Sequence, residues 1–302
     1  SMPSPPGARS PHRDELYPPY LRGPYAGNGV ASGSPDKTPV YAWNPEEKMS
    51  VDSASAVIIL PERQYSLFTK CFAEFLATTI FVFIGCMQGY VGNNADAILH
   101  AAFAHGITIF FLVASIGHIS GGHINPAVSL GATLTGHLPL YHLPCYFVSQ
   151  MLGGCFGSIL TVAILTQSEY TAILGGATLL NVEAGNTWFQ GLTSEAIVTF
   201  ILFHTIVNAA MDTTTNTLAP LAIGFTLTAN IIATGRITGC SMNPARSFGP
   251  NLIGYFFIDH ATLDAADWWT YHYIYWAGPA IGASLVAGYH WLLESRKNRV
   301  VE

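Results

Sequence analysis

The sequence predicts an all-α membrane protein with six transmembrane helices and two re-entrant half-helices, arranged as an inverted repeat. Three observations support this fold class. Half of the 302 residues are hydrophobic, 10% are charged and the mean hydropathy is +0.35, whereas soluble domains average about 25% charged residues. No Lys or Arg occurs from Cys71 to Gly235. The two halves of the chain also repeat one order of long and short apolar segments.

This composition excludes a soluble protein and a nucleic-acid-binding protein. A soluble surface needs mixed charges, and a nucleic-acid-binding face needs clustered basic residues. The first apolar run is too late and too long for a cleavable signal peptide. The cysteines show neither metal-ligand spacing nor a disulfide framework, so we expect free thiols and no metal. They are Cys71, Cys86, Cys145, Cys155 and Cys240.

Residues 1–65 are expected to form a disordered cytoplasmic tail, because they contain eleven of the eighteen prolines and few large apolar residues. A membrane domain is expected over 66–295. Six segments within it are long enough to cross a bilayer at about 20 residues each. They are 67–91, 97–118, 140–165, 191–211, 217–234 and 270–293.

Basic residues flank the first span, at Arg63 and Lys70, and follow the last span. The positive-inside rule therefore predicts that both termini are cytoplasmic. An even number of crossings satisfies this prediction, and residues 296–302 would then form a short cytoplasmic C-terminal tail.

Two further apolar segments, 122–134 and 240–253, are too short to span and are expected to be re-entrant. Each follows the second span of its half, so repeat one covers about 66–166 and repeat two about 190–295. Three spans per repeat is an odd number, so the second repeat enters the membrane from the opposite side. Folds of this kind place their sites at the repeat interface near the membrane midplane.

Each short segment contains the same tripeptide, Asn125-Pro126-Ala127 and Asn243-Pro244-Ala245. Asn is a favoured N-cap and Pro a favoured first helical residue, so each tripeptide predicts the start of a helix. The inverted halves would bring two positive helix ends together at the membrane centre. We expect the Asn amides to remain free to donate into a pore, and the positive ends to exclude protons and cations.

From about Ser66 to Glu294 the chain resembles the aquaporin (major intrinsic protein) family. The matching motifs are AEFLATTIFVFIG, GHISGGHINPAVSL, YFVSQMLGG, LAPLAIGFT, SMNPARSFGP and HYIYWAGP. The resemblance implies a homotetramer in the lipid bilayer with one passive pore per protomer. It also implies no catalysis, no cofactor and no nucleic-acid partner.

The resemblance assigns the outer constriction to His105, Ile231, Cys240 and Arg246. Strict water channels of the family carry Phe and His at the first two positions, so the ring here is expected to be wider. This combination is similar to the aquaporin-eight-like and tonoplast-type branch, which implies passage of ammonia and hydrogen peroxide besides water. Glycerol is the alternative solute, although Ser247 and Tyr275-Trp276 match the water-channel side.

Glu74 and Glu195 occupy equivalent positions in the two repeats. Carboxylates at membrane depth need donors, so we expect them to accept hydrogen bonds from the loops before the half-helices. A proton relay is the alternative. His118 and His123 are expected to brace the first loop. The loop carbonyls would form an acceptor track through the pore, and the loop glycines would permit the unusual backbone angles. These carbonyls belong to Gly121, Gly122, His123, Ile124, Gly239, Cys240, Ser241 and Met242.

Two other classes of function stay open at this point. A secondary transporter uses the same inverted-repeat architecture, and a closed structural or junctional membrane protein could keep the motifs of a pore. The plasma membrane and an internal membrane are both compatible with the sequence.

Overall fold

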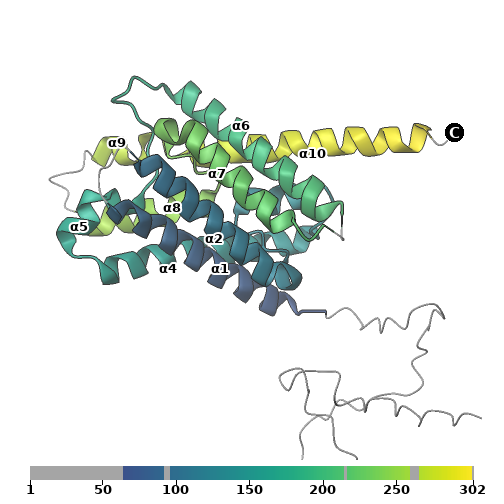
Figure 1. Ribbon diagram of the computed structural model, residues 1–302, viewed down its shortest axis with the longest axis horizontal. Coiled ribbons are helices and arrows are strands. Elements are labelled where there is room, and N and C mark those ends of the chain that lie inside the picture. The colour runs from purple at the N-terminus through teal and green to yellow at the C-terminus, as the bar shows by residue number, and fades with distance from the viewer. Residues whose placement is uncertain (1–63, 92–95, 214–215, 259–264, 301–302) are drawn as a thin grey trace, which may run out of the picture. The chain divides into compact units, whose positions relative to one another are not determined.

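The computed structural model describes residues 64–91, 96–213, 216–258 and 265–300 (Figure 1). The chain divides into two units, Ser1–Pro61 and Glu62–Glu302. The N-terminal tail expected over residues 1–65 lies outside the described residues, except for residues 64 and 65. Everything below concerns the second unit.

Two sets of four helices make up this unit. The first set is α1 (Leu67–Met87), α2 (Ala97–Ser120), α3 (Pro126–Leu134) and α4 (Leu143–Ile164). The second is α6 (Trp188–Ile206), α7 (Ala219–Thr238), α8 (Pro244–Phe257) and α10 (Ile274–Val300). In each set the third helix is short and follows an extended loop, as the sequence predicts for a re-entrant segment.

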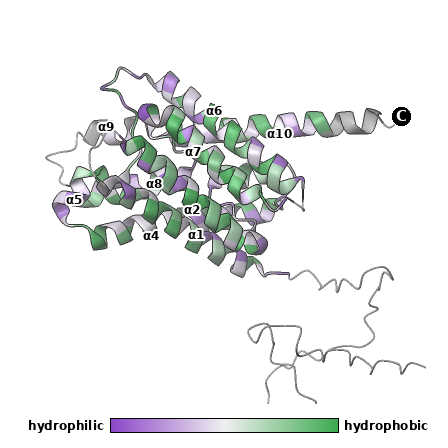
Figure 2. Ribbon diagram, viewed as in Figure 1, coloured by the Kyte–Doolittle hydropathy of each residue, from purple (hydrophilic) through white to green (hydrophobic). Residues whose placement is uncertain are grey.

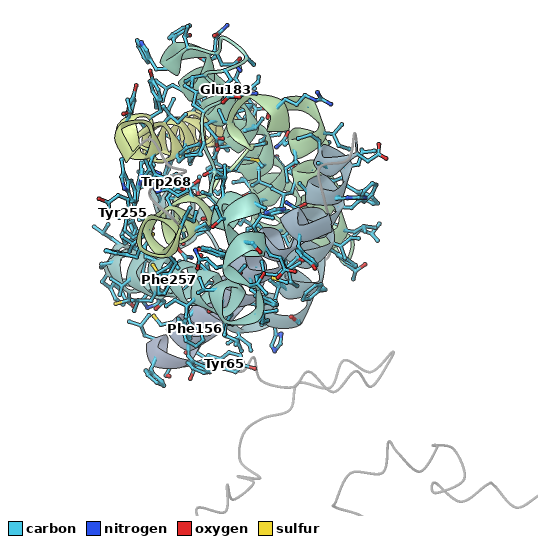
Figure 3. The ribbon with its side chains drawn as sticks, turned by 90° about the vertical axis from the view of Figure 1, so that its left-hand side faces the viewer. Tyr65, Phe156, Glu183, Tyr255, Phe257 and Trp268 are labelled. Carbon is cyan, nitrogen blue, oxygen red and sulfur yellow. The ribbon has the colours of Figure 1, made fainter. Side chains whose placement is uncertain are left out.

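Short elements connect these helices. They are η3 (Gln88–Val91), η4 (Leu140–His142), α5 (Gln167–Ala172), η5 (Leu174–Gly176), the π-helical η6 (Val207–Met211) and α9 (Ala265–Thr270). The short helices α5 and α9, which the sequence analysis did not predict, lie at one end of the bundle (Figure 1). In the view from that end, Trp268 lies beside Tyr255 (Figure 3). The Trp268 indole donates to the Asn251 carbonyl oxygen at 2.9 Å.

Five of the described helices are long and apolar enough to cross a membrane: those starting at Leu67, Ala97, Leu140, Trp188 and Ala219. The sixth predicted span corresponds to α10, which has 27 residues but is less apolar. Because α10 continues to Val300, most of the residues expected to form a C-terminal tail extend this helix. The predicted all-helical membrane fold is confirmed.

The two sets pack in the same way. α1 packs against α4, α6 packs against α10, and α2 packs against α7. Small residues allow these close approaches: a Cβ on Gly153 of α4 would lie 2.5 Å from the Phe75 carbonyl oxygen of α1. A Cβ on Gly282 of α10 would overlap the Ala196 carbonyl oxygen of α6 in the same manner. The repeat read from the sequence is therefore also a repeat of helix packing.

The outer surface of the bundle is apolar. Large hydrophobic side chains are exposed along α1, α2, α4 and α6, among them Phe72, Ile107, Leu152 and Ile197. Figure 2 shows hydrophobic residues along these helices. Soluble monomers rarely expose so much contiguous apolar surface, so this surface fits contact with lipid or with other membrane-embedded protein.

Candidate functional site

The two half-helices begin where local chemistry predicts. Asn125 caps α3, and its Oδ1 accepts a hydrogen bond from Ala127 N at 2.8 Å. Asn243 caps α8, and its Oδ1 accepts from Ala245 N at 3.0 Å and from Arg246 N at 3.3 Å. In both cases Pro follows as the first helical residue, where its missing N–H leaves no intrahelical bond unmade.

The two caps are joined across the repeat interface. Asn125 Nδ2 donates to the Met242 carbonyl oxygen at 2.7 Å, and Asn243 Nδ2 donates to the Ile124 carbonyl oxygen at 2.9 Å. The expectation that both amides stay free is therefore wrong for one N–H of each. Each amide has two N–H groups, so one remains to serve a passing solute. The reason is tertiary: the two loops approach closely enough to pair with each other.

The loops before the half-helices have unusual backbone conformations. Six of their residues have positive φ: Gly121 (92°), Gly122 (61°), Ile124 (56°), Gly239 (78°), Cys240 (51°) and Met242 (55°). Such angles were expected at the loop glycines alone. Three of the six carry side chains, and a β-branched residue such as Ile124 is a rare occupant of this region. Interactions from elsewhere must hold these loops in place.

Glu74 holds the first loop. This carboxylate has no exposed surface, and it accepts hydrogen bonds from His123 N at 2.9 Å and Ile124 N at 2.6 Å. It also accepts from Ser120 Oγ at 2.6 Å and Gln150 Nε2 at 2.8 Å. All four donors are buried, so the carboxylate fixes a backbone that would otherwise have unpaired N–H groups at membrane depth.

Glu195 holds the second loop in the same way. It accepts from Thr238 Oγ1 at 2.6 Å, from Ser241 N at 2.9 Å and from Met242 N at 2.7 Å. Among the described carboxylates, Glu74 and Glu195 are thus used as hydrogen-bond acceptors for backbone and side chains. No donor–acceptor chain from either of them toward a second acid is present in the described ranges.

Sequence reasoning missed the residues that support these two acids. Ser120 and Thr238 each lie five residues before a capping Asn, and that matching position could have revealed them. The Tyr146 hydroxyl donates to the Ser120 carbonyl oxygen at 2.7 Å, and the Tyr275 hydroxyl donates to the Thr238 carbonyl oxygen at 2.8 Å. No sequence spacing relates these two tyrosines to the loops, since helix packing brings them there.

The two histidines of the first loop region have different environments. His123 is buried, with Nδ1 lying 3.1 Å from Ser129 Oγ. The expectation that His118 also braces the loop is wrong. It lies exposed in the last turn of α2, against the Tyr65 ring, and lines a cavity.

This cavity, of about 830 Å³, leads from one end of the bundle to the two caps. Its outer part is lined by Tyr65, Lys70 and His118, and its inner end by Asn125 and Asn243. Apolar walls between them come from three helices, at Phe81 of α1, Ile109 of α2 and Leu227 of α7. The half-helix caps therefore face an open approach from this end.

None of the four residues assigned to a constriction lines this cavity. One helical turn past Ile109 and Leu227 come His105 and Ile231, at 4% and 3% exposure. His105 and Cys240 both lie within electrostatic reach of the Arg246 guanidinium. All four side chains are buried.

Arg246 is 7% exposed, and its Nη1 donates to the Gly176 carbonyl oxygen at 2.9 Å. Within the described ranges the guanidinium forms no ion pair with a carboxylate. Its remaining N–H groups are available to a solute, because a guanidinium carries five donors. Gly176 belongs to a connecting segment 70 residues away, which the sequence analysis did not connect to the site.

Comparisons with known proteins agree with this arrangement. The family model described as major intrinsic protein matches residues 62–290. Aquaporin-8 of Mus musculus is 32% identical over 255 residues, covering 84% of this chain and 92% of the relative. A probable TIP-type aquaporin of Nicotiana tabacum is 40% identical over 224 residues, covering 70% of this chain and 82% of the relative.

The fold also matches a solved structure. The aquaglyceroporin from Plasmodium falciparum superposes with a TM-score of 0.61 at 20% identity, covering 74% of this chain and 96% of that chain. At this identity the likeness concerns the fold. Joined caps, two acid-braced loops and the match over most of the chain lead to one conclusion: the chain belongs to the major intrinsic protein family, the aquaporins.

Proposed function

We propose that this chain is a passive transmembrane channel for water and small neutral solutes that excludes protons and ions. The observation that carries the proposal is the reciprocal pairing of the two caps, Asn125 Nδ2 to Met242 O and Asn243 Nδ2 to Ile124 O, at the inner end of an 830 Å³ cavity. It places two helix N-termini, with their positive partial charges, at one point.

The free N–H of each cap would donate to the oxygen of a passing water. A water held by two donors cannot also accept a proton from its neighbour, so the hydrogen-bonded chain is interrupted there. The loop carbonyls of residues 121–124 and 239–242 would accept hydrogen bonds on either side. Of these, Ile124 and Met242 each use one lone pair for the opposite Asn, and a carbonyl has two.

His105, Ile231, Cys240 and Arg246 would form the narrow filter. A buried guanidinium without a carboxylate partner raises the energy of any cation close to it. His105 adds a buried imidazole and Ile231 an apolar wall, a lining suited to small polar molecules without net charge. We infer that ammonia and hydrogen peroxide pass in addition to water.

Glycerol is the second candidate solute, favoured by the fold likeness to the Plasmodium falciparum aquaglyceroporin. Two side chains whose identity bears on the choice between water and glycerol already form hydrogen bonds within the protein. Ser247 Oγ donates to Ser241 Oγ at 2.6 Å, and the Tyr275 hydroxyl donates to Thr238 O. Neither is free to serve a polyol, so we rank glycerol below water.

Assembly and topology belong to the same proposal. The apolar outer faces of α1, α2, α4 and α6 fit a homotetramer surrounded by lipid. The end carrying Lys70 would face the cytoplasm, with both termini on that side of a plasma or internal membrane. The channel domain would cover residues 66–295, as two inverted repeats and with no enzymatic activity.

Stopped-flow light scattering of proteoliposomes tests the proposal. We expect osmotic shrinkage faster than that of empty vesicles, non-saturating, with a low activation energy and no dissipation of a proton gradient. A saturable, gradient-coupled flux would indicate a transporter. Rates equal to those of empty vesicles, at verified protein incorporation, would refute a channel and favour a structural role.

A further inference from the structure

Gly85 of α1 lies at the level of the filter. Phe81 of α1, Ile109 of α2 and Leu227 of α7 line the wall of the cavity. Residues four apart on a helix share a face, so one turn beyond these three positions lie Gly85, His105 and Ile231. Of these three residues, His105 and Ile231 were assigned to the constriction from the sequence, and Gly85 occupies the corresponding position on the third helix.

The His105 ring fills the space where a side chain of residue 85 would be. A Cβ built on Gly85 would overlap Nε2 of His105, and would lie 3.1 Å from both Cδ2 and Cε1 of the ring. These distances are well inside the 3.4 Å at which ordinary van der Waals contact begins. The imidazole therefore rests directly on the α1 backbone and lies along the wall between α1 and α2.

Two contacts hold the ring in this orientation. Nδ1 lies 2.8 Å from the Ala101 carbonyl oxygen, and the ring meets Phe81 edge to face at 5.4 Å. A carbonyl only accepts, so Nδ1 must carry a hydrogen, and in the neutral imidazole Nε2 is then an acceptor. Nε2 has no partner among the described residues. A buried acceptor without a donor is costly, so the ring is placed here by shape and by Nδ1 rather than by Nε2.

We propose that Gly85 is a specificity-determining residue of the pore, because its missing side chain lets the His105 ring withdraw toward α1 and widens the filter. The solutes it admits are small neutral molecules wider than water, such as amides. This inference rests on the proposed channel function and deepens it. Any side chain at residue 85 displaces the ring by roughly 1 Å toward the pore, since a methyl group cannot share this space.

The experiment uses the full-length chain in proteoliposomes and measures two rates for each variant. Water permeability comes from osmotic shrinkage, and formamide permeability from the swelling that follows a formamide gradient. We expect Gly85→Ala to lower the formamide-to-water ratio about tenfold, equivalent to about 1.4 kcal/mol of added barrier for formamide. Gly288→Ala is the matched control, because a Cβ on Gly288 of α10 would meet nothing within 4 Å.

The double variant Gly85→Ala/His105→Ala identifies the cause. If the methyl group acts by displacing the imidazole, removing the imidazole restores the ratio to the wild-type value or above. An unchanged ratio in Gly85→Ala overturns the proposal, and so does a lowered ratio that the double variant fails to restore.

Two further outcomes separate this inference from the proposed function. A wild-type protein that conducts water but no formamide overturns the wide filter and leaves the water channel standing. A wild-type protein that conducts neither overturns the channel itself. If Gly85→Ala fails to reach the membrane while the double variant reaches it and conducts formamide, that result supports the clash between residue 85 and His105. A double variant that also fails overturns it.

Discussion

Removing the Glu195 carboxylate should release the loop that leads into α8. In Glu195→Ala, Ser241 N and Met242 N lose their acceptor, and Thr238 Oγ1 loses its own. The hydroxyl can rotate to another partner, but the two backbone N–H groups cannot. Each buried unsatisfied donor costs about 1–3 kcal/mol, so the two together cost about 2–6 kcal/mol. Met242 and Cys240 have positive φ, and relaxation of that strain favours the same release.

The conservative variant Glu195→Gln should lose about half of the stabilisation free energy that Glu195→Ala loses. Glutamine keeps one oxygen, which can serve Ser241 N, but it presents an NH₂ group where Met242 N needs an acceptor. We therefore expect Glu195→Gln to cost about 1–3 kcal/mol, the value for one orphaned donor. Glu183→Ala is the matched control, because Glu183 is an exposed carboxylate (Figure 3).

Three measurements follow the release. Water permeability per incorporated protein should fall in the order wild type, Glu195→Gln, Glu195→Ala. The thermal unfolding midpoint in detergent should drop by at least about 4 °C for the alanine variant. Labelling of the Cys240 thiol, which is 2% exposed, should accelerate when followed by mass spectrometry of its peptide. A Glu195→Ala protein with wild-type permeability and unchanged Cys240 labelling would refute the bracing role.

Three further predictions concern the filter. Mercury should block water flux by binding the Cys240 thiol, so Cys240→Ser should abolish the block. Cys86→Ser, which removes another buried thiol, should leave the block in place. A block that survives Cys240→Ser rejects the assignment of Cys240 to the filter. His105→Phe with Ile231→His should narrow the ring and slow hydrogen peroxide relative to water, measured with a peroxide-sensitive dye inside vesicles; equal peroxide rates in wild type and double variant contradict the wide filter. Arg246→Val should allow cations through the pore, which a vesicle conductance assay detects. If this variant still excludes cations, the exclusion comes from the two half-helix caps alone.

The spans were predictable because they depend on composition along one segment at a time. The long apolar runs predicted α1, α2, α4, α6 and α7 with errors of a few residues at their ends. The sixth run was also a helix, but its length was misjudged, because α10 continues to Val300. The short helices α5 and α9 were missed, since each is a six-residue helix between spans with no apolar period to reveal it.

Most of the candidate site could be named but not built from the sequence. Glu74 and Glu195 were identified by their matching positions, whereas Ser120, Thr238 and Gln150, which complete their surroundings, were not. A carboxylate at membrane depth must accept hydrogen bonds, but which residues donate them depends on which helices face it. Loop strain was assigned to glycines, although Ile124 is held at positive φ by bonds that only the folded chain supplies.

The sequence by itself determined the membrane class, the repeat and the starting residues of both half-helices. Those features follow from interactions within a few residues, such as Asn125 Oδ1 with Ala127 N. The tertiary structure decided where the Asn amides point, pairing Asn125 with Met242 across 117 residues and Asn243 with Ile124 across 119. It also decided that the His105 ring rests on Gly85. Such contacts join helices distant in sequence, and close packing fixes their geometry where no local preference does.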